Sequence, residues 1–69
     1  MISKKDETYK DLRYRIITHD LKPMEPLNEK ALMGHYGLGR TPMREVLLQL
    51  QKDGLIQRFS RSGTIVSPV

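Results

Sequence analysis

The residues best suited to chemistry lie together in residues 37–46, where a glycine-bounded turn runs into the start of a predicted helix. Arg40 and Arg44 are four positions apart, so they share one face of that helix. The free N–H groups and the dipole of a helix N-terminus already attract anions such as phosphate. Two arginines and the Thr41 hydroxyl at such a terminus therefore predict binding to a polyanion.

The helix that carries these arginines is predicted over about residues 40–53. Gly39 or Thr41 caps its start, Pro42 is compatible only with its first turn, and Gly54 ends it. The side opposite the arginines is an apolar stripe that we expect in the core, formed by Met43, Val46, Leu47 and Leu50.

A shorter helix is predicted just before the turn, from Asn28 as its N-cap to about Tyr36. Glu29 places a negative charge in its first turn, and Gly37 ends it. Its apolar side chains are expected to face inward, with one more filling the turn: Ala31, Leu32, Met33, Tyr36 and Leu38. The two helices together predict a helix-turn-helix whose second helix presents cations from its N-terminal end.

The first part of the chain predicts another helix, over about residues 6–19, capped by Thr8 or Asp6. A proline-containing linker follows over residues 22–26, and then Leu27 as a single extended residue. The apolar side of this helix consists of Tyr9, Leu12 and Ile16, extended by Ile17 and Leu21.

The last part of the chain, residues 55–69, predicts a β-hairpin. Its strands are residues 56–59 and 64–66, joined by turn-forming residues 60–63. The whole order predicts a mainly α fold with a small β-hairpin, which is a winged helix-turn-helix of three helices plus a wing.

Length and composition exclude several classes of protein. A chain of 69 residues forms one small domain, which buries only about 60% of its unfolded surface. It has no cysteine, and His19 and His35 lack companions at metal-site spacing, so we expect no metal, cofactor or catalytic site. No apolar run approaches the ~20 residues of a membrane span, and the N-terminus lacks a signal-peptide core. We therefore expect a soluble, intracellular protein.

The net charge of +4 is distributed unevenly. In residues 1–29, six basic side chains are balanced by six acidic ones, whereas residues 30–69 hold six basic side chains and only Glu45 and Asp53 as acids. All of the excess positive charge thus falls on the helix-turn-helix and the hairpin. Such a basic region on this motif is the electrostatic pattern expected for DNA binding.

Four separated blocks also carry a family resemblance: residues 27–32, 37–47, 54–56 and 63–66. Their sequences and spacing resemble the DNA-binding domain of GntR-family bacterial transcription regulators, and the resemblance covers about residues 9–66. The segment Arg-Thr-Pro-Met-Arg-Glu at residues 40–45 is most similar to the FadR-like subfamily.

The resemblance implies a metabolite-responsive repressor or activator in the bacterial cytoplasm, associated with the nucleoid through double-stranded DNA. Such regulators bind palindromic operators as homodimers and carry a C-terminal domain for the small-molecule effector. No such domain follows the wing here, so we expect residues 1–69, with an ordered core over about 6–66, to be either a single domain cut from a longer protein, which we favour, or an unusually short member of the family.

The family contacts DNA from its second helix, from the start of its recognition helix (here about residues 40–53) and from its wing tip (here about residues 60–63). The resemblance places DNA-binding residues at Lys30, Gly39, Arg40, Thr41, Pro42, Arg44, Ser60, Arg61 and Gly63. Gly39 departs from the family, which usually has serine or threonine there, so one hydroxyl contact with phosphate is lost. Glu45 is expected to orient Arg44 or to bond a neighbouring element.

Two other functions compete with sequence-specific DNA binding. A winged-helix module for protein–protein contact would use the basic face to meet an acidic partner. A non-specific architectural DNA-binding module would hold any duplex with similar affinity. Both predict binding that does not depend on base sequence.

Overall fold

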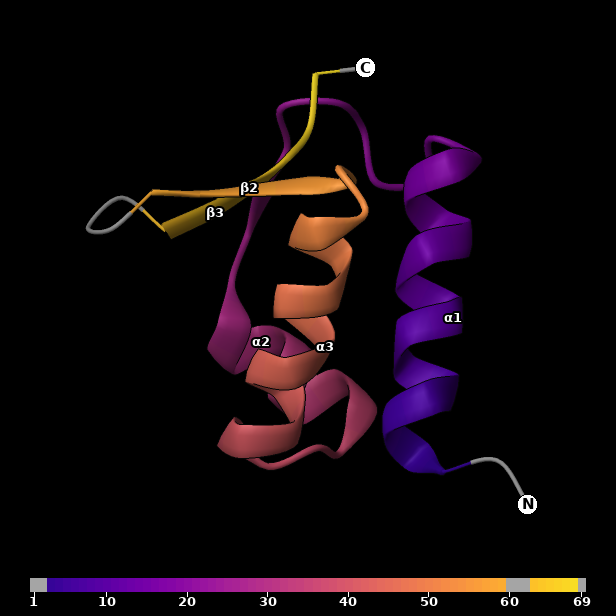
Figure 1. Ribbon diagram of the computed structural model, residues 1–69, viewed down its shortest axis with the longest axis vertical. Coiled ribbons are helices and arrows are strands. Elements are labelled where there is room, and N and C mark those ends of the chain that lie inside the picture. Colours follow the sequence, from indigo (N-terminus) through magenta and orange to yellow (C-terminus); the bar gives the residue numbers. More distant parts are fainter. Residues whose placement is uncertain (1–2, 60–62, 69) are drawn as a thin grey trace.

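A computed structural model describes residues 3–59 and 63–68 of the chain. The elements run in the order α1 (Lys4–Ile17), β1 (Pro26–Leu27), α2 (Glu29–Tyr36), α3 (Arg40–Lys52), β2 (Ile56–Phe59) and β3 (Gly63–Val66). Figure 1 shows α1 and α3 side by side, with the β2–β3 hairpin projecting from the end of the domain where α3 finishes. The predicted three helices plus wing are confirmed.

The first helix begins earlier than predicted. Ser3, and neither Asp6 nor Thr8, is the N-cap of α1, and its hydroxyl accepts a hydrogen bond from the Asp6 N–H at 3.1 Å. Thr8 is buried one turn later, where its hydroxyl donates to the Lys4 carbonyl at 2.9 Å. The helix ends at Ile17, whose side chain is exposed, so the expectation that it extends the apolar side is wrong.

The turn between α2 and α3 forms as predicted. The Asn28 side chain accepts from the Ala31 N–H at 3.0 Å at the start of α2, and Gly37 ends the helix in the left-handed region with φ of 65°. Leu38 is buried in the turn, and Gly39 is the N-cap of α3. Ala31 was expected to face inward, but it is exposed because Leu32 and Tyr36, four positions apart, define the packed face.

The three strands form one antiparallel sheet in the order β1-β3-β2. Pro26 lies opposite Ile65 and Leu27 opposite Thr64, so the segment before α2 pairs with strand β3 of the hairpin. The sequence predicted only an extended Leu27 here and did not predict this pairing. Proline suits this position because β1 is an edge strand, where a missing N–H is tolerated.

Helix α3 forms the centre of the core. Its stripe of Met43, Val46, Leu47 and Leu50 is fully buried, as predicted. The remaining buried apolar side chains come from α1, the turn and the hairpin: Leu12, Ile16, Leu38, Ile56 and Val66. Packing of α3 on one side leaves its opposite side, with Arg40 and Arg44, exposed to solvent. Within the described residues, no helix is long and apolar enough to cross a membrane.

Candidate nucleic-acid interface

Three of the predicted contact residues meet around one hollow between α2 and α3. Lys30 from α2 and Arg40 and Arg44 from α3 line a depression of about 350 Å3, together with Glu29 and Met33. Lys30, Arg40 and Arg44 are all exposed. The hollow therefore presents three cations to solvent beside the N-terminus of α3, where free N–H groups add to the positive potential.

The first turn of α3 is accessible from solvent. Gly39, Arg40 and Thr41 are exposed and Pro42 is half-buried. Gly39 makes no side-chain capping bond, and its φ of −72° is one that any residue adopts. A Cβ built there would meet only Pro42 at 3.8 Å, so packing does not require glycine at this N-cap. The N–H groups of this turn are therefore left without a side-chain cap.

Glu29 forms ion pairs with two arginines from different elements. Its Oε1 lies 3.5 Å from Nε of Arg44 on α3, and its Oε2 lies 4.0 Å from Nη2 of Arg58 on β2. Arg58 was not predicted from the sequence to be part of this surface. Its only signal was its membership of the basic second part of the chain, because nothing local links a strand residue to α2.

Glu45 bonds a neighbouring element, which was one of its two predicted roles. Its Oε1 lies 3.1 Å from Nζ of Lys5 on α1, and Arg44 is paired instead with Glu29. Glu45 thus ties α1 to α3, on a different side of α3 from its neighbour Arg44.

The wing is described on both sides of its tip. Gly63 begins β3 opposite Phe59, is exposed, and has φ of 93°, a conformation that favours glycine. Ser60, Arg61 and Ser62 lie outside the described residues, so the other predicted wing contacts, Ser60 and Arg61, stay predictions.

Residues 4–66 match the family described as "Bacterial regulatory proteins, gntR family". The chain belongs to the GntR family. It is 40% identical over 63 residues to an uncharacterised helix-turn-helix transcriptional regulator from an unstable DNA locus of Streptomyces ambofaciens, covering 91% of this chain and 27% of that protein. It is 32% identical to the transcriptional repressor RspR of Escherichia coli K12, covering 91% of this chain and 28% of the repressor. The chain thus spans about a quarter of the length of these GntR-type relatives.

Solved structures agree with the GntR assignment. The DNA-binding domain of AraR, crystallised with operator ORR3, superposes with a TM-score of 0.88 over 97% of this chain and 82% of that one. At 24% identity this match establishes the winged-helix fold. A crystal structure of a GntR-family transcriptional regulator superposes with a TM-score of 0.82 at 29% identity, covering 94% of this chain and 26% of that one. The finer FadR-like assignment stays a prediction.

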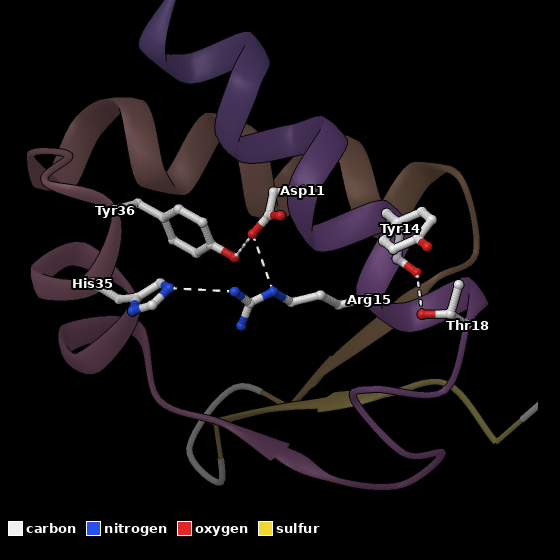
Figure 2. Close-up of polar contacts among 6 residues, drawn as sticks. All are labelled: Asp11, Tyr14, Arg15, Thr18, His35 and Tyr36. Carbon is white, nitrogen blue, oxygen red and sulfur yellow. Dashed lines mark hydrogen bonds and ion pairs between the residues drawn. The ribbon is translucent and has the colours of Figure 1, made fainter.

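A polar cluster joins α1 to α2 behind the GntR-type helix-turn-helix (Figure 2). The Tyr36 hydroxyl donates to Oδ2 of Asp11 at 2.5 Å, and Nε of Arg15 lies 3.1 Å from the same oxygen. The Arg15 guanidinium also reaches Nε2 of His35 at 3.5 Å. Because arginine only donates, this ring nitrogen is the acceptor. The cluster fixes the C-terminal end of α2 and hence helps to orient the helix that carries Lys30.

Two tyrosines have a raised pKa in this fold. Burial and the hydrogen bond to Asp11 raise the pKa of Tyr36 well above its ordinary value of 10. The pKa of Tyr9 is raised mainly by its hydrogen bond to Asp53, which joins α1 to the end of α3. Both phenols therefore hold their protons more tightly in the folded domain than in the unfolded chain.

Tyr36→Phe should lower the free energy of unfolding by about 1–3 kcal/mol near neutral pH, because the Asp11 carboxylate loses a donor. The stabilisation that comes from the raised pKa of Tyr36 is complete below pH 10, the pKa of tyrosine in the unfolded chain. It is lost as the pH rises from there through the higher pKa of Tyr36 in the folded domain. Urea denaturation from pH 8 to 11 should therefore show wild type losing stability toward the alkaline end more steeply than Tyr36→Phe. Parallel curves would contradict this role of Tyr36.

No group of three or more histidine, cysteine, aspartate or glutamate side chains within residues 3–59 and 63–68 is arranged to hold a metal ion. His35 is engaged with Arg15 and packs its ring edge-on against Tyr36, with centroids 4.7 Å apart. The side chains of Lys30, Arg40 and Arg44 supply hydrogen-bond donors and positive charge at the candidate interface.

Proposed function

We propose that this domain binds duplex DNA, with α3 entering the major groove from its N-terminal end and the hairpin lying beside the minor groove. The observation that carries this proposal is the hollow where Lys30, Arg40 and Arg44 converge beside the exposed start of α3. The packed side of α3 faces the core, and the side with the arginines is exposed and available to a ligand. Binding in place of catalysis is the role we assign to these residues.

The proposed contacts divide into those that position the domain and those that select a sequence. Arg40 and Arg44 are placed to contact base edges or phosphates, and an arginine that grips guanine O6 and N7 discriminates by ~1–3 kcal/mol. Lys30 and Thr41 are assigned to phosphates, as is the backbone N–H of Gly39. Pro42 has no N–H to donate, so its proposed contact with DNA is one of packing. Ser60, Arg61 and Gly63 would contact the minor groove from the wing.

For the whole protein we propose a bacterial transcription regulator of the cytoplasm, acting as a homodimer on a palindromic operator. The part of this proposal that concerns regulation is supported by RspR, a relative named as a transcriptional repressor, and the part that concerns operator binding by the similar fold of the AraR domain, which was crystallised with operator ORR3. A small-molecule effector would act through a separate domain of the regulator by changing the spacing of the two DNA-binding heads. The present domain would need no cofactor of its own.

Binding to DNA should weaken steeply with salt. Each phosphate neutralised contributes a slope of about −0.9 in log K against log salt, so three to four cations predict a slope of roughly −3. The preferred site would first be selected from a randomised duplex pool, and its affinity then measured by fluorescence anisotropy from low to physiological salt. An affinity that hardly changed with salt would contradict the DNA-binding proposal.

The same titration separates the competing functions. A random duplex of equal length is the control, and we expect the selected duplex to bind more tightly at every salt concentration. Equal binding of both duplexes would favour a non-specific module. Equal binding of duplexes and of an acidic polypeptide would favour a protein-interaction module.

A further inference from the structure

Glu29 lies where three elements of the proposed interface meet. It stands in the first turn of α2, and its two carboxylate oxygens face Arg44 of α3 and Arg58 of β2. The Glu29 side chain is 29% exposed, whereas those of Arg44 and Arg58 are 51% and 36% exposed. The half-buried Glu29 carboxylate thus pairs with two arginines whose side chains are more exposed than its own, and it lines the hollow together with one of them, Arg44.

We propose that Glu29 is a positioning and specificity-determining residue that presents Arg44 and Arg58 to DNA together, which makes Arg58 a further DNA contact. This inference rests on the proposed DNA binding. In the absence of DNA, the Glu29 carboxylate holds Arg44 and Arg58 in place. A phosphate must compete with this carboxylate before it can bind either arginine. DNA that satisfies Arg44 in the oriented position is then favoured over DNA that offers only charge.

The location of Glu29 suits this role. A carboxylate in the first turn of a helix is stabilised by the helix dipole, and the Asn28 side chain caps the same turn. Arginine side chains are long and lose much rotamer freedom when they are immobilised. Holding them beforehand reduces the ordering that binding would otherwise require.

The same carboxylate also reduces non-specific binding. It carries the sign of the DNA backbone and partly neutralises Arg44 and Arg58, so attraction to phosphate alone is weaker. A specific DNA sequence is thereby selected in two ways, by the favourable contact of Arg44 and by the repulsion between the Glu29 carboxylate and phosphates. Removing the Glu29 charge should therefore raise the affinity for DNA of any sequence and lower the preference for the specific sequence.

Arg58 extends the interface from the helix-turn-helix to the stem of the wing. It lies opposite Thr64 in the β2–β3 pairing and is exposed. Glu29 engages one of its nitrogens at 4.0 Å, and a guanidinium has five N–H donors. We assign the remaining donors to a phosphate beside the hairpin.

The test is Glu29→Gln, which keeps the size of the side chain and removes its charge. The variant should bind a random duplex several-fold more tightly than wild type does. The ratio of affinities for the selected and random duplexes should fall by about tenfold, within the range that one arginine–base contact contributes. A ratio and a random-duplex affinity equal to those of wild type would overturn the proposal.

Glu45→Gln is the matched control, since it removes the same charge from an exposed ion pair whose partner, Lys5, lies on α1. Its ratio of affinities should stay within about twofold of the wild-type value. An equal fall in both variants would show that net charge alone is responsible, and this would overturn the role of Glu29.

Further variants test the arginines separately. Arg58→Ala, at an exposed position, should weaken binding to both duplexes several-fold, and an unchanged affinity would overturn its role as a contact. In an Arg44→Ala background, Glu29→Gln should no longer lower the ratio, whereas a further tenfold fall would overturn the positioning of Arg44. Failure of wild type itself to distinguish the duplexes would refute the proposed function, separately from the role of Glu29.

Discussion

Leu47→Ala should lower the free energy of unfolding by about 2–5 kcal/mol, because it removes a fully buried side chain and leaves a cavity. Leu47 is 1% exposed and lies in the middle of α3, among core side chains from α1 and the sheet. A domain of 69 residues has a total stability of roughly 3–10 kcal/mol at typical values per residue. The substitution therefore removes a large part of the stability, and urea denaturation followed by circular dichroism would measure it.

The adjacent Leu48 supplies the control on the same helix. Its side chain is 46% exposed, so Leu48→Ala should cost less than about 1 kcal/mol. The two variants change the same residue type at neighbouring positions and differ in the side of α3 they affect. Losses of equal size would mean that α3 is not oriented as described, and the exposure of Arg40 and Arg44 would then be in doubt.

The helix-turn-helix could be predicted from the sequence because its determinants are local. Asn28 bonds an N–H three residues later, and Gly37 adopts a left-handed conformation that few other residues accept. The apolar stripe of α3 has an unbroken helical period, so its buried side followed directly from spacing. The cap, the glycine and the apolar spacing each lie within, or directly beside, the helix that they specify.

The features that were missed depend on contacts distant in sequence. The pairing of Pro26 with Ile65 joins segments on either side of the helix-turn-helix, and no two-residue strand has a periodicity of its own. The start of α1 was predicted too late because Ser3, Asp6 and Thr8 are all acceptable caps; in the fold Ser3 caps the helix and Thr8 is buried within it. The sequence limits which residues can cap a helix and which segments can pair, and tertiary contacts determine which of them do.

The candidate interface shows the same division. The spacing of Arg40 and Arg44 placed them on one exposed side of α3, which the structure confirms, and Lys30 joins them at the hollow. The ion pairs of Glu29 with Arg44 and Arg58 arise only when α2, α3 and β2 pack together. Charge counting found an excess of positive residues in this half of the chain, but it could not assign an acid to its partners.

Linking two copies of the domain should raise its affinity for a palindromic site far more than any added contact would. A parallel coiled coil fused after Val69 would make the second binding event intramolecular, with an expected gain of ~10²–10⁴-fold. The position suits a fusion because the Ser67 N–H donates to the Leu55 carbonyl just beyond the C-terminal end of α3, whereas Arg40 begins that helix at its other end. The linker would thus leave the hollow uncovered. Anisotropy titrations of the single and fused domains on the selected site would measure the gain.

Two duplexes serve as controls for this gain. On a duplex with one half-site, the fused domains should bind only about as tightly as the single domain. Half-sites separated by one helical turn of about 10–10.5 base pairs present the same face of the DNA, and an additional half turn presents opposite faces. The gain should therefore diminish when about five base pairs are inserted between the half-sites. A gain that persisted on the half-site duplex would show that the fused domains hold DNA by charge alone, contradicting recognition of a palindrome by two symmetric heads.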